Sequence, residues 1–389
     1  MSRLQELIQR LCPNGVEYRP LGEVCNILRG KRLTKTDMVS DGIYPVYHGG
    51  LDPLGHYDKS NREANTVMII NVGASAGTVG FCDKAFWSSD GCFCLSHSAD
   101  VKSKFAYYYL SNNQKDFVSK VRRAGIPTLD AKVIQDYVIP VPPIEVQEEV
   151  VRILDTFSAH AAELQAELQA RKEQYDYYRN LLLTFSPSAC GCGTDGEQEL
   201  GLTIWGGHSY EIAWKTMGEI FVMKAGKAIP SSEIKDYNPG NYCACFGANG
   251  LRGYVQKANR QTNNIIIGRQ GALCGNISYA KGPYYATDHA VVIENSPVFD
   301  NHFLFHLLVN ANLNQYKTSG AQPGLSVEIL KQIVIPVPPL DLQLRIASIL
   351  DRFEALVNDL TQGLPAEIAA CRERYEYFRN KLLTFKKIA

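Results

Sequence analysis

The chain contains one long sequence pattern twice, and this repeat constrains its fold more than any other feature. Residues 138–155 read VIPVPPIEVQEEVVRILD, and residues 334–351 read VIPVPPLDLQLRIASILD, at an offset of 196 residues. A second matching pair, YDYYRNLLLTF and YEYFRNKLLTF, ends at Phe185 and Phe385. A repeat at half the length of a 389-residue chain indicates two copies of one structural design.

The segment after each proline cluster has the period of a coiled-coil helix. Its apolar residues alternate in steps of three and four, so they form one stripe along a helix. A helix of about 40 residues is about 60 Å long. Two stripes of matching register most simply pack on each other, and we expect an antiparallel pair. Two alternatives are that each stripe is core for its own domain, or that it forms a homodimeric coiled coil.

The second stripe contains an irregularity. It steps by four residues twice around Ile368, which is a four-residue insertion relative to the first stripe. Gly363 and Pro365 lie at this point. Proline interrupts helical hydrogen bonding, so we expect a kink or a break there.

The remaining sequence predicts a mixed α/β (α+β) fold with two similar globular units. Short β-rich runs bounded by Gly and Asn precede one helical segment in each unit. Gly73 and Gly77 of the first unit match Gly271 and Gly275 of the second. The predicted organisation is an N-terminal helix (1–17), a first domain (18–143), a long helix (144–186), a linker with a lead-in strand (187–213), a second domain (214–339) and a second long helix (340–389).

Charge distribution and cysteine content indicate which partners and which cell compartment to expect for the chain. The net charge is zero, but the two domains carry +3 and +4 while residues 144–213 carry −8. Neither a signal peptide nor a transmembrane run is visible, so the chain is expected to be cytoplasmic, with no membrane partner. Its 11 cysteines are then reduced thiols. A metal site is not expected; the pair to consider as an exception is Cys190 with Cys192.

The layout resembles the specificity (S) subunit of type I restriction–modification systems, the HsdS family. The resemblance covers essentially the whole chain and rests on the two IPVPP helix starts, on the two YRN/FRN helix ends, and on the CPNGVEYRPLGEV opening. It implies that each domain is a target recognition domain that reads one half of a bipartite site in double-stranded DNA. It also implies that the helices space the domains and bind two modification subunits, which carry S-adenosylmethionine and methylate adenine. A restriction subunit would add ATP- and Mg²⁺-dependent activity.

The chain itself is expected to be non-catalytic and to bind no cofactor. It lacks a D/N-P-P-Y/F loop of adenine methyltransferases and a G-x-x-x-x-G-K-[ST] loop for ATP. Its segments GASAGTVG and GRQGALCG lie between predicted strands, whereas a phosphate cradle needs a helix N-terminus, so they are expected to be turns. Asp90, Asp288 and His289 are better explained by turn capping than by acid–base chemistry.

Candidate DNA contacts follow from the side chains that read base edges or hold phosphates, namely Arg, Lys, Asn and Gln. In the first domain they are accompanied by one tyrosine and one histidine. The candidates there are Arg29, Lys31, Arg32, Lys35, Tyr47, His48, Arg122 and Arg123. In the second domain they are Lys227, Asn249, Arg252, Arg269, Gln270, Lys317 and Gln322. For each of these residues the alternative is a solvated surface side chain.

Two rival functions belong to other classes. A coiled-coil scaffold with two β-rich domains for protein or glycan ligands predicts no salt-sensitive affinity for DNA. A stand-alone DNA enzyme predicts activity from the single chain. The acidic residues of the first long helix, Glu148, Glu149, Glu163 and Glu167, are expected to form a solvated stripe or to meet a basic partner surface.

Overall fold

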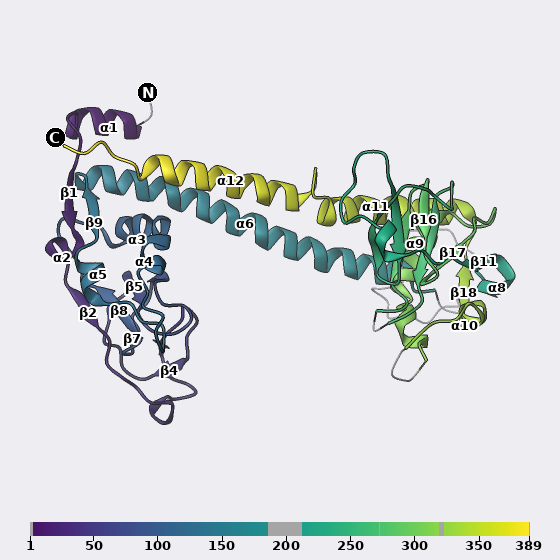
Figure 1. Cartoon of the computed structure of the whole chain (residues 1–389), viewed down its shortest axis with the longest axis horizontal. Coiled ribbons are helices and arrows are strands. Elements are labelled where there is room, and N and C mark those ends of the chain that lie inside the picture. The colour runs from purple at the N-terminus through teal and green to yellow at the C-terminus, as the bar shows by residue number, and fades with distance from the viewer. Residues whose placement is uncertain (1–2, 186–211, 272, 319–322, 389) are drawn as a thin grey trace, which may run out of the picture. The chain divides into compact units, whose positions relative to one another are not determined.

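The computed structural model describes residues 3–185, 212–271, 273–318 and 323–388. The chain divides into two compact units, one formed by Met1–Gln165 with Glu367–Ala389 and the other by Ala166–Ala366. The helix α6 (Ile144–Leu183) is 40 residues long and contributes to both. Each unit is described by itself (Figure 1).

The first unit builds its globular part from residues that precede α6. Its elements are α1 (Arg3–Leu11), β1 (Glu17–Pro20), α2 (Leu21–Val24), β2 (Ile27–Arg29), η1 (Lys35–Asp37), β3 (Tyr44–Tyr47), β4 (Gly55–Tyr57), β5 (Thr66–Ile70), β6 (Val79–Cys82), β7 (Trp87–Ser88), β8 (Cys92–Leu95), α3 (Ser103–Asn112), α4 (Gln114–Ser119), α5 (Ala131–Gln135) and β9 (Val138–Val141). They form a sheet of order β2-β8-β5-β6, a second of order β4-β3-β7 and the antiparallel pair β1-β9.

The second unit repeats this topology. Its elements are β10 (Ala213–Thr216), α8 (Met217–Ile220), β11 (Met223–Ala225), η2 (Ser231–Glu233), β12 (Cys243–Gly247), β13 (Gly250–Val255), β14 (Asn264–Gly268), β15 (Ile277–Ala280), β16 (Tyr284–Ala286), β17 (Ala290–Ile293), α9 (Asn301–Asn310), η3 (Leu313–Tyr316), α10 (Val327–Gln332), β18 (Val334–Val337), α11 (Leu340–Asn358) and the start of α12 (Leu364–Leu382). The sheets have the orders β11-β17-β14-β15 and β13-β12-β16, with β10-β18 as the pair. The predicted α+β fold with an internal repeat is therefore confirmed.

The central strands are continuous apolar runs because both of their faces are covered. Every residue of β5 and β14 is buried. In the first unit α3 packs on this sheet, and the core cluster extends from Leu4 and Leu7 of α1 to Val150 and Leu154 of α6. The N-terminal amphipathic helix is thus part of the core of the first unit.

A buried glutamine explains why the proline cluster and helix start recur together. Gln147 lies one turn into α6 and is fully buried; its amide nitrogen donates to the carbonyls of Asp100 and Pro142, and its amide oxygen accepts from the backbone N–H of Lys102. Gln343 makes the same three bonds in the second unit, to residues 298, 338 and 300. Each amide ties the start of a long helix to the loop before α3 or α9.

The long helices pair within each unit through equivalent aromatic stacks. In the first unit Phe157 of α6 stacks on Phe378 of α12, with ring centroids 5.4 Å apart. In the second unit Tyr178 of α6 stacks on Phe353 of α11 at 5.6 Å. The end of α12 packs beside the start of α6, since Leu382 packs against the core cluster that contains Val150, so this pair is antiparallel (Figure 1).

The second long segment is interrupted where the glycine and proline predicted a break. The helix α11 ends at Asn358 and α12 begins at Leu364, with Pro365 in its first turn, where a missing N–H is tolerated. A Cβ on Gly363 would lie 2.6 Å from the carbonyl oxygen of Ala355 and 2.8 Å from that of Asp359. Only glycine fits this close return of the chain onto the end of α11.

The structure also bears on the predicted glycine turns and on the cysteines. The segments after β5 and β14 are turns between strands, with Gly73, Gly77, Gly271 and Gly275 at positive φ. Cys92 and Cys94 lie buried in β8, and the described cysteines are free thiols. Cys190 and Cys192 lie outside the described residues. Among the helices described, none has the length and apolar character needed to cross a membrane.

The prediction of an exposed acidic stripe on α6 is wrong for one residue, Glu149. Glu149 is 4% exposed, and its carboxylate accepts two hydrogen bonds from Arg152, which lower its pKa. Glu148, Glu163 and Glu167 are exposed, as expected. The heptad assignment did not reveal that Glu149 faces the N-terminal helix, where Arg3 lies 3.7 Å away.

Candidate nucleic-acid interface

In the first unit most candidate residues lie on loops at the ends of the strands. Arg29 ends β2, Lys31 and Arg32 follow it, and Lys35 begins η1; all four are exposed. Arg122 and Arg123 lie after α4 and are exposed as well. These side chains are therefore free to meet a ligand without rearrangement of the core.

Backbone hydrogen bonds bring these loops together although they are far apart in sequence. The N–H of Lys31 donates to the carbonyl of Ser88, and the N–H of Ser89 donates to that of Tyr47. The loop after β5 is connected in the same way. The N–H of Asn71 donates to the carbonyl of Gly91, and the N–H of Leu129 donates to the carbonyl of Asn71. Residues 29–32, 47–49, 71–73 and 122–129 thus belong to one connected set of loops.

Tyr47 and His48 have structural contacts within this set. Tyr47 is half-buried, packs edge-on against Phe86 and has its pKa raised to about 12 by burial, so its hydroxyl stays protonated. Nδ1 of His48 lies 3.3 Å from the carboxylate of Asp90. Asp90 also accepts from the hydroxyl of Ser89 at the turn before β8, in agreement with its predicted structural role.

The second unit gathers the corresponding segments. Three backbone N–H groups donate to carbonyls of distant segments: Lys227 to Ala286, Thr287 to Phe246, and Arg269 to His289. Gln270 forms an isolated β-bridge with Gly324, as Val72 does with Thr128 in the first unit. Lys227, Asn249, Arg252 and Lys317 are exposed, whereas Gln322 lies outside the described residues.

Arg252 and Arg269 are both restrained by the fold. Arg252 donates to the hydroxyl of Ser231 at 2.9 Å. Arg269 is half-buried, and its Nε is buried without a hydrogen-bond partner. Arg269 therefore presents only part of its guanidinium to a ligand.

Sequence reasoning missed an asparagine-lined hollow beside Asn249. Asn276, Asn312 and Asn314 line it together with Asn249 and Leu273. Nζ of Lys317 donates to the side-chain oxygen of Asn314 at 2.8 Å. These residues come from three separate segments, so their shared location was not visible in the sequence.

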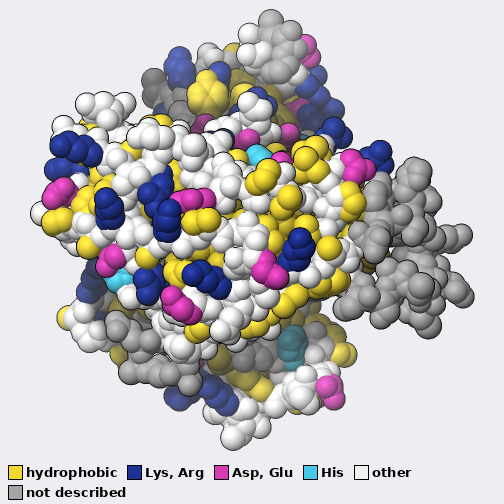
Figure 2. Space-filling model, turned by 90° about the vertical axis from the view of Figure 1, so that its right-hand side faces the viewer, with side chains coloured by type: hydrophobic (Ala, Val, Ile, Leu, Met, Phe, Trp, Pro, Cys, Tyr) yellow, Lys and Arg dark blue, Asp and Glu magenta, His cyan; other side chains and the backbone are white. Residues whose placement is uncertain are grey.

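One face of the molecule carries charges of both signs. On the face shown in Figure 2, Lys and Arg side chains are scattered among acidic, hydrophobic and uncharged polar ones.

Two copies of one α+β unit, each with polar and basic loops at its strand ends and each joined to a long helix, define a protein with two equivalent binding modules. A family model described as "Type I restriction modification DNA specificity domain" matches residues 13–173 and again residues 211–370. The chain belongs to this family of type I specificity subunits.

Similar proteins span nearly the whole chain. The type I restriction enzyme EcoprrI specificity subunit of Escherichia coli is 38% identical, over 93% of this chain and 93% of its own length. The EcoR124I/EcoR124II specificity subunit of the same species is 28% identical, over 100% of this chain and 98% of its own length. In fold, the chain matches the S subunit from M. genitalium with a TM-score of 0.65 at 21% identity, covering 95% of this chain and 96% of that one.

Proposed function

We propose that this chain selects the DNA sequence on which a type I restriction–modification complex acts, with each unit reading one half of a bipartite, asymmetric site. The observation that carries the proposal is the repeated topology with different side chains at corresponding loop positions. The exposed Arg32 of one unit stands where the other has Ala228, and Val72 stands where the other has Gln270. Different donors and acceptors on equivalent loops would read different bases.

We further propose that the long helices set the gap between the half-sites. The 40 residues of α6 correspond to about 60 Å of helix. The aromatic stacks and the buried glutamines hold each module on its helix pair. A helix held in this way would act as a rigid spacer.

The chemistry is assigned to partner subunits. Two modification subunits with S-adenosylmethionine would methylate adenine, and restriction subunits would add ATP- and Mg²⁺-dependent cleavage, all in the cytoplasm. Exposed faces of the helix pairs are the proposed docking surfaces for the modification subunits. The burial of Tyr47, and of Cys92 with its pKa raised to about 12, leaves these groups protonated and unsuited to nucleophilic attack.

The test is a genome-wide map of methylated adenines in a host without adenine methylation that expresses this chain with its methyltransferase. We expect one split motif for the wild type. Replacing Lys31 and Arg32 with alanine should relax one half of that motif, and Asn249→Ala should relax only the other half. A relaxed base preference at such a contact corresponds to about 1–3 kcal/mol.

The matched control is Arg10→Ala, an exposed arginine on α1, which should leave both halves unchanged. A single variant that altered both halves would contradict the assignment of one half to each unit. Absence of methylation from an assembled complex would instead favour the scaffold with protein or glycan ligands.

A further inference from the structure

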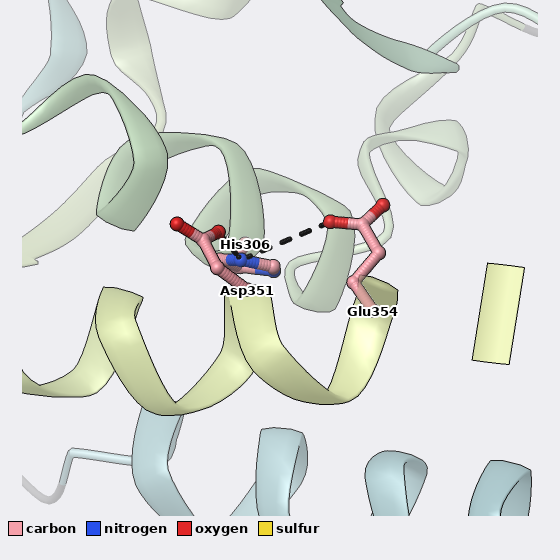
Figure 3. Close-up of side chains that lie close together, drawn as sticks. All are labelled: His306, Asp351 and Glu354. Carbon is pink, nitrogen blue, oxygen red and sulfur yellow. Dashed lines mark hydrogen bonds and ion pairs between the residues drawn. The ribbon is translucent and has the colours of Figure 1, made fainter. Parts of the chain in front are cut away.

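A cluster of ligand-type side chains lies where α9 meets α11 in the second unit, away from the recognition loops. His306 of α9 is completely buried, and its Nε2 lies 2.8 Å from Oδ1 of Asp351 and 4.0 Å from Oε2 of Glu354. The three ligand atoms all lie within 4.8 Å of one another. Figure 3 shows the two carboxylates rising from α11 on either side of the imidazole.

Two carboxylates converge on this buried imidazole. The side chain of His306 is 0% exposed, whereas those of Asp351 and Glu354 are 39% and 35% exposed, so the cluster can be reached from the surface on its carboxylate side. His302 lies on the far side of Asp351, and Arg179 pairs with Asp176 at 2.9 Å.

The first unit supplies an internal comparison. At the equivalent place Asp155 of α6 accepts hydrogen bonds from Lys104 and Tyr108 of α3, which join the two helices without a second carboxylate. The repeat aligns these residues with Asp351, His302 and His306, and it aligns Ser158 with Glu354. Fastening the two helices therefore needs neither a histidine nor the glutamate that the second unit adds.

We propose that His306 Nε2, Asp351 and Glu354 form a binding site for one divalent transition-metal ion, of which Zn²⁺ is the best match. One imidazole and two carboxylates make a three-ligand set that leaves a coordination position for water. Ligand atoms about 2.0–2.2 Å from a tetrahedral zinc lie about 3.3–3.6 Å apart. The two spacings from His306, 2.8 and 4.0 Å, lie on either side of this range, and all three ligand atoms lie within 4.8 Å of one another, so small side-chain movements would bring them to a common ion.

Neighbouring side chains supply the outer contacts that metal-bound histidines and carboxylates use. The hydroxyl of Tyr175 lies 3.3 Å from Nδ1 of His306, so its oxygen can accept a hydrogen bond from Nδ1–H once Nε2 binds a metal. Nδ1 of His302 lies 3.0 Å from Oδ2 of Asp351 and orients that carboxylate. The bound ion would link α9 of the recognition module to α11.

The test is a titration of the full-length chain, stripped with a chelator, with Co²⁺ followed by its visible absorption, and then displacement by Zn²⁺. The chain carries Cys190→Ser and Cys192→Ser so that these thiols do not bind metal. We expect one equivalent of Co²⁺ with the spectrum of nitrogen and oxygen ligands. Glu354→Gln should weaken binding at least tenfold, while Lys104→Ala in the first unit should leave it unchanged.

A second readout guards against variants that only unfold. A ligand that binds the folded chain stabilises it, so Zn²⁺ should raise the Tm of the parent. Zn²⁺ should leave the Tm of Glu354→Gln unchanged.

Two results would overturn the site. One is the absence of a bound equivalent of either ion. The other is binding that survives Glu354→Gln unchanged, because such binding would belong to other groups. A Glu163→Gln variant, which changes an exposed glutamate on α6, should alter neither metal affinity nor Tm.

Discussion

At the residue scale, two buried amides account for the most recognisable part of the sequence. Gln147 and Gln343 each follow a Pro-Pro pair by four residues and each bind three backbone groups that have no strand or helix partner. The sequence pattern predicted the helix start but not this role, because a glutamine in the first turns of a helix is ordinarily exposed. The role depends on contacts with residues 43–47 positions away.

We expect Gln147→Leu to destabilise the chain. The substitution keeps the approximate size of the side chain but leaves the carbonyls of Asp100 and Pro142 and the N–H of Lys102 without partners. An unsatisfied buried group costs about 1–3 kcal/mol. The measurement is urea-induced unfolding followed by circular dichroism.

Gln169→Leu, an exposed glutamine on the same helix, is the matched control and should change the free energy of unfolding by less than about 0.5 kcal/mol. Equal stability of the two variants would show that the buried amide contributes nothing.

At the element scale, the long helices were the most predictable part of the molecule. Their apolar period is local information, and the extra four residues near Ile368 together with Gly363 and Pro365 predicted the break between α11 and α12. The glycine turns after β5 and β14 were also predictable, because positive φ favours glycine.

The candidate binding surfaces were less predictable. Which loops meet depends on how distant strands pair, so the joining of residues 29–32 to 87–92 could not be read from the sequence. The asparagine-lined hollow and the His306 cluster could not be predicted for the same reason: their residues are distant in the sequence. His306 and Asp351, for example, lie 45 residues apart. Arg269 was a reasonable candidate by residue type, but its partial burial is a property of the fold.

The break between α11 and α12 can be tested with Gly363→Ala. The added Cβ would approach backbone carbonyl oxygens of Ala355, Leu356 and Asp359 to 2.6–2.8 Å, so the chain must move. We expect a loss of about 1–3 kcal/mol, as for other overpacked positions. Thermal unfolding measures it.

Gly50→Ala is the control for this substitution, because no atom lies within 4 Å of the Cβ that it would add. If Gly363→Ala and Gly50→Ala unfolded at the same temperature, the close return of the chain at residue 363 would not be required.

At the scale of the whole molecule, the chain is one module and one helix start used twice. Both modules have the same sheet orders and the same buried glutamine. They differ in their loops. They also differ around one equivalent aspartate: Asp351 of the second unit lies beside two histidines and Glu354, whereas Asp155 of the first unit binds a lysine and a tyrosine. Shared frameworks with different loops are what two readers of different half-sites require.

In the proposed function, two independent readers are held apart by a helical spacer. The most direct test inserts one heptad into α6 between Phe157 and Tyr178 and a matching heptad into α12 before Phe378, and then maps methylated adenines. Seven residues add about 10 Å of helix, which corresponds to about three base pairs at 3.4 Å each. A chain with one heptad replaced by another of equal length is the control.

We predict that both half-sites stay the same and that only the gap between them widens, by about three base pairs, while the control keeps the original gap. An unchanged gap in the lengthened chain, or altered bases in either half-site, would contradict the account.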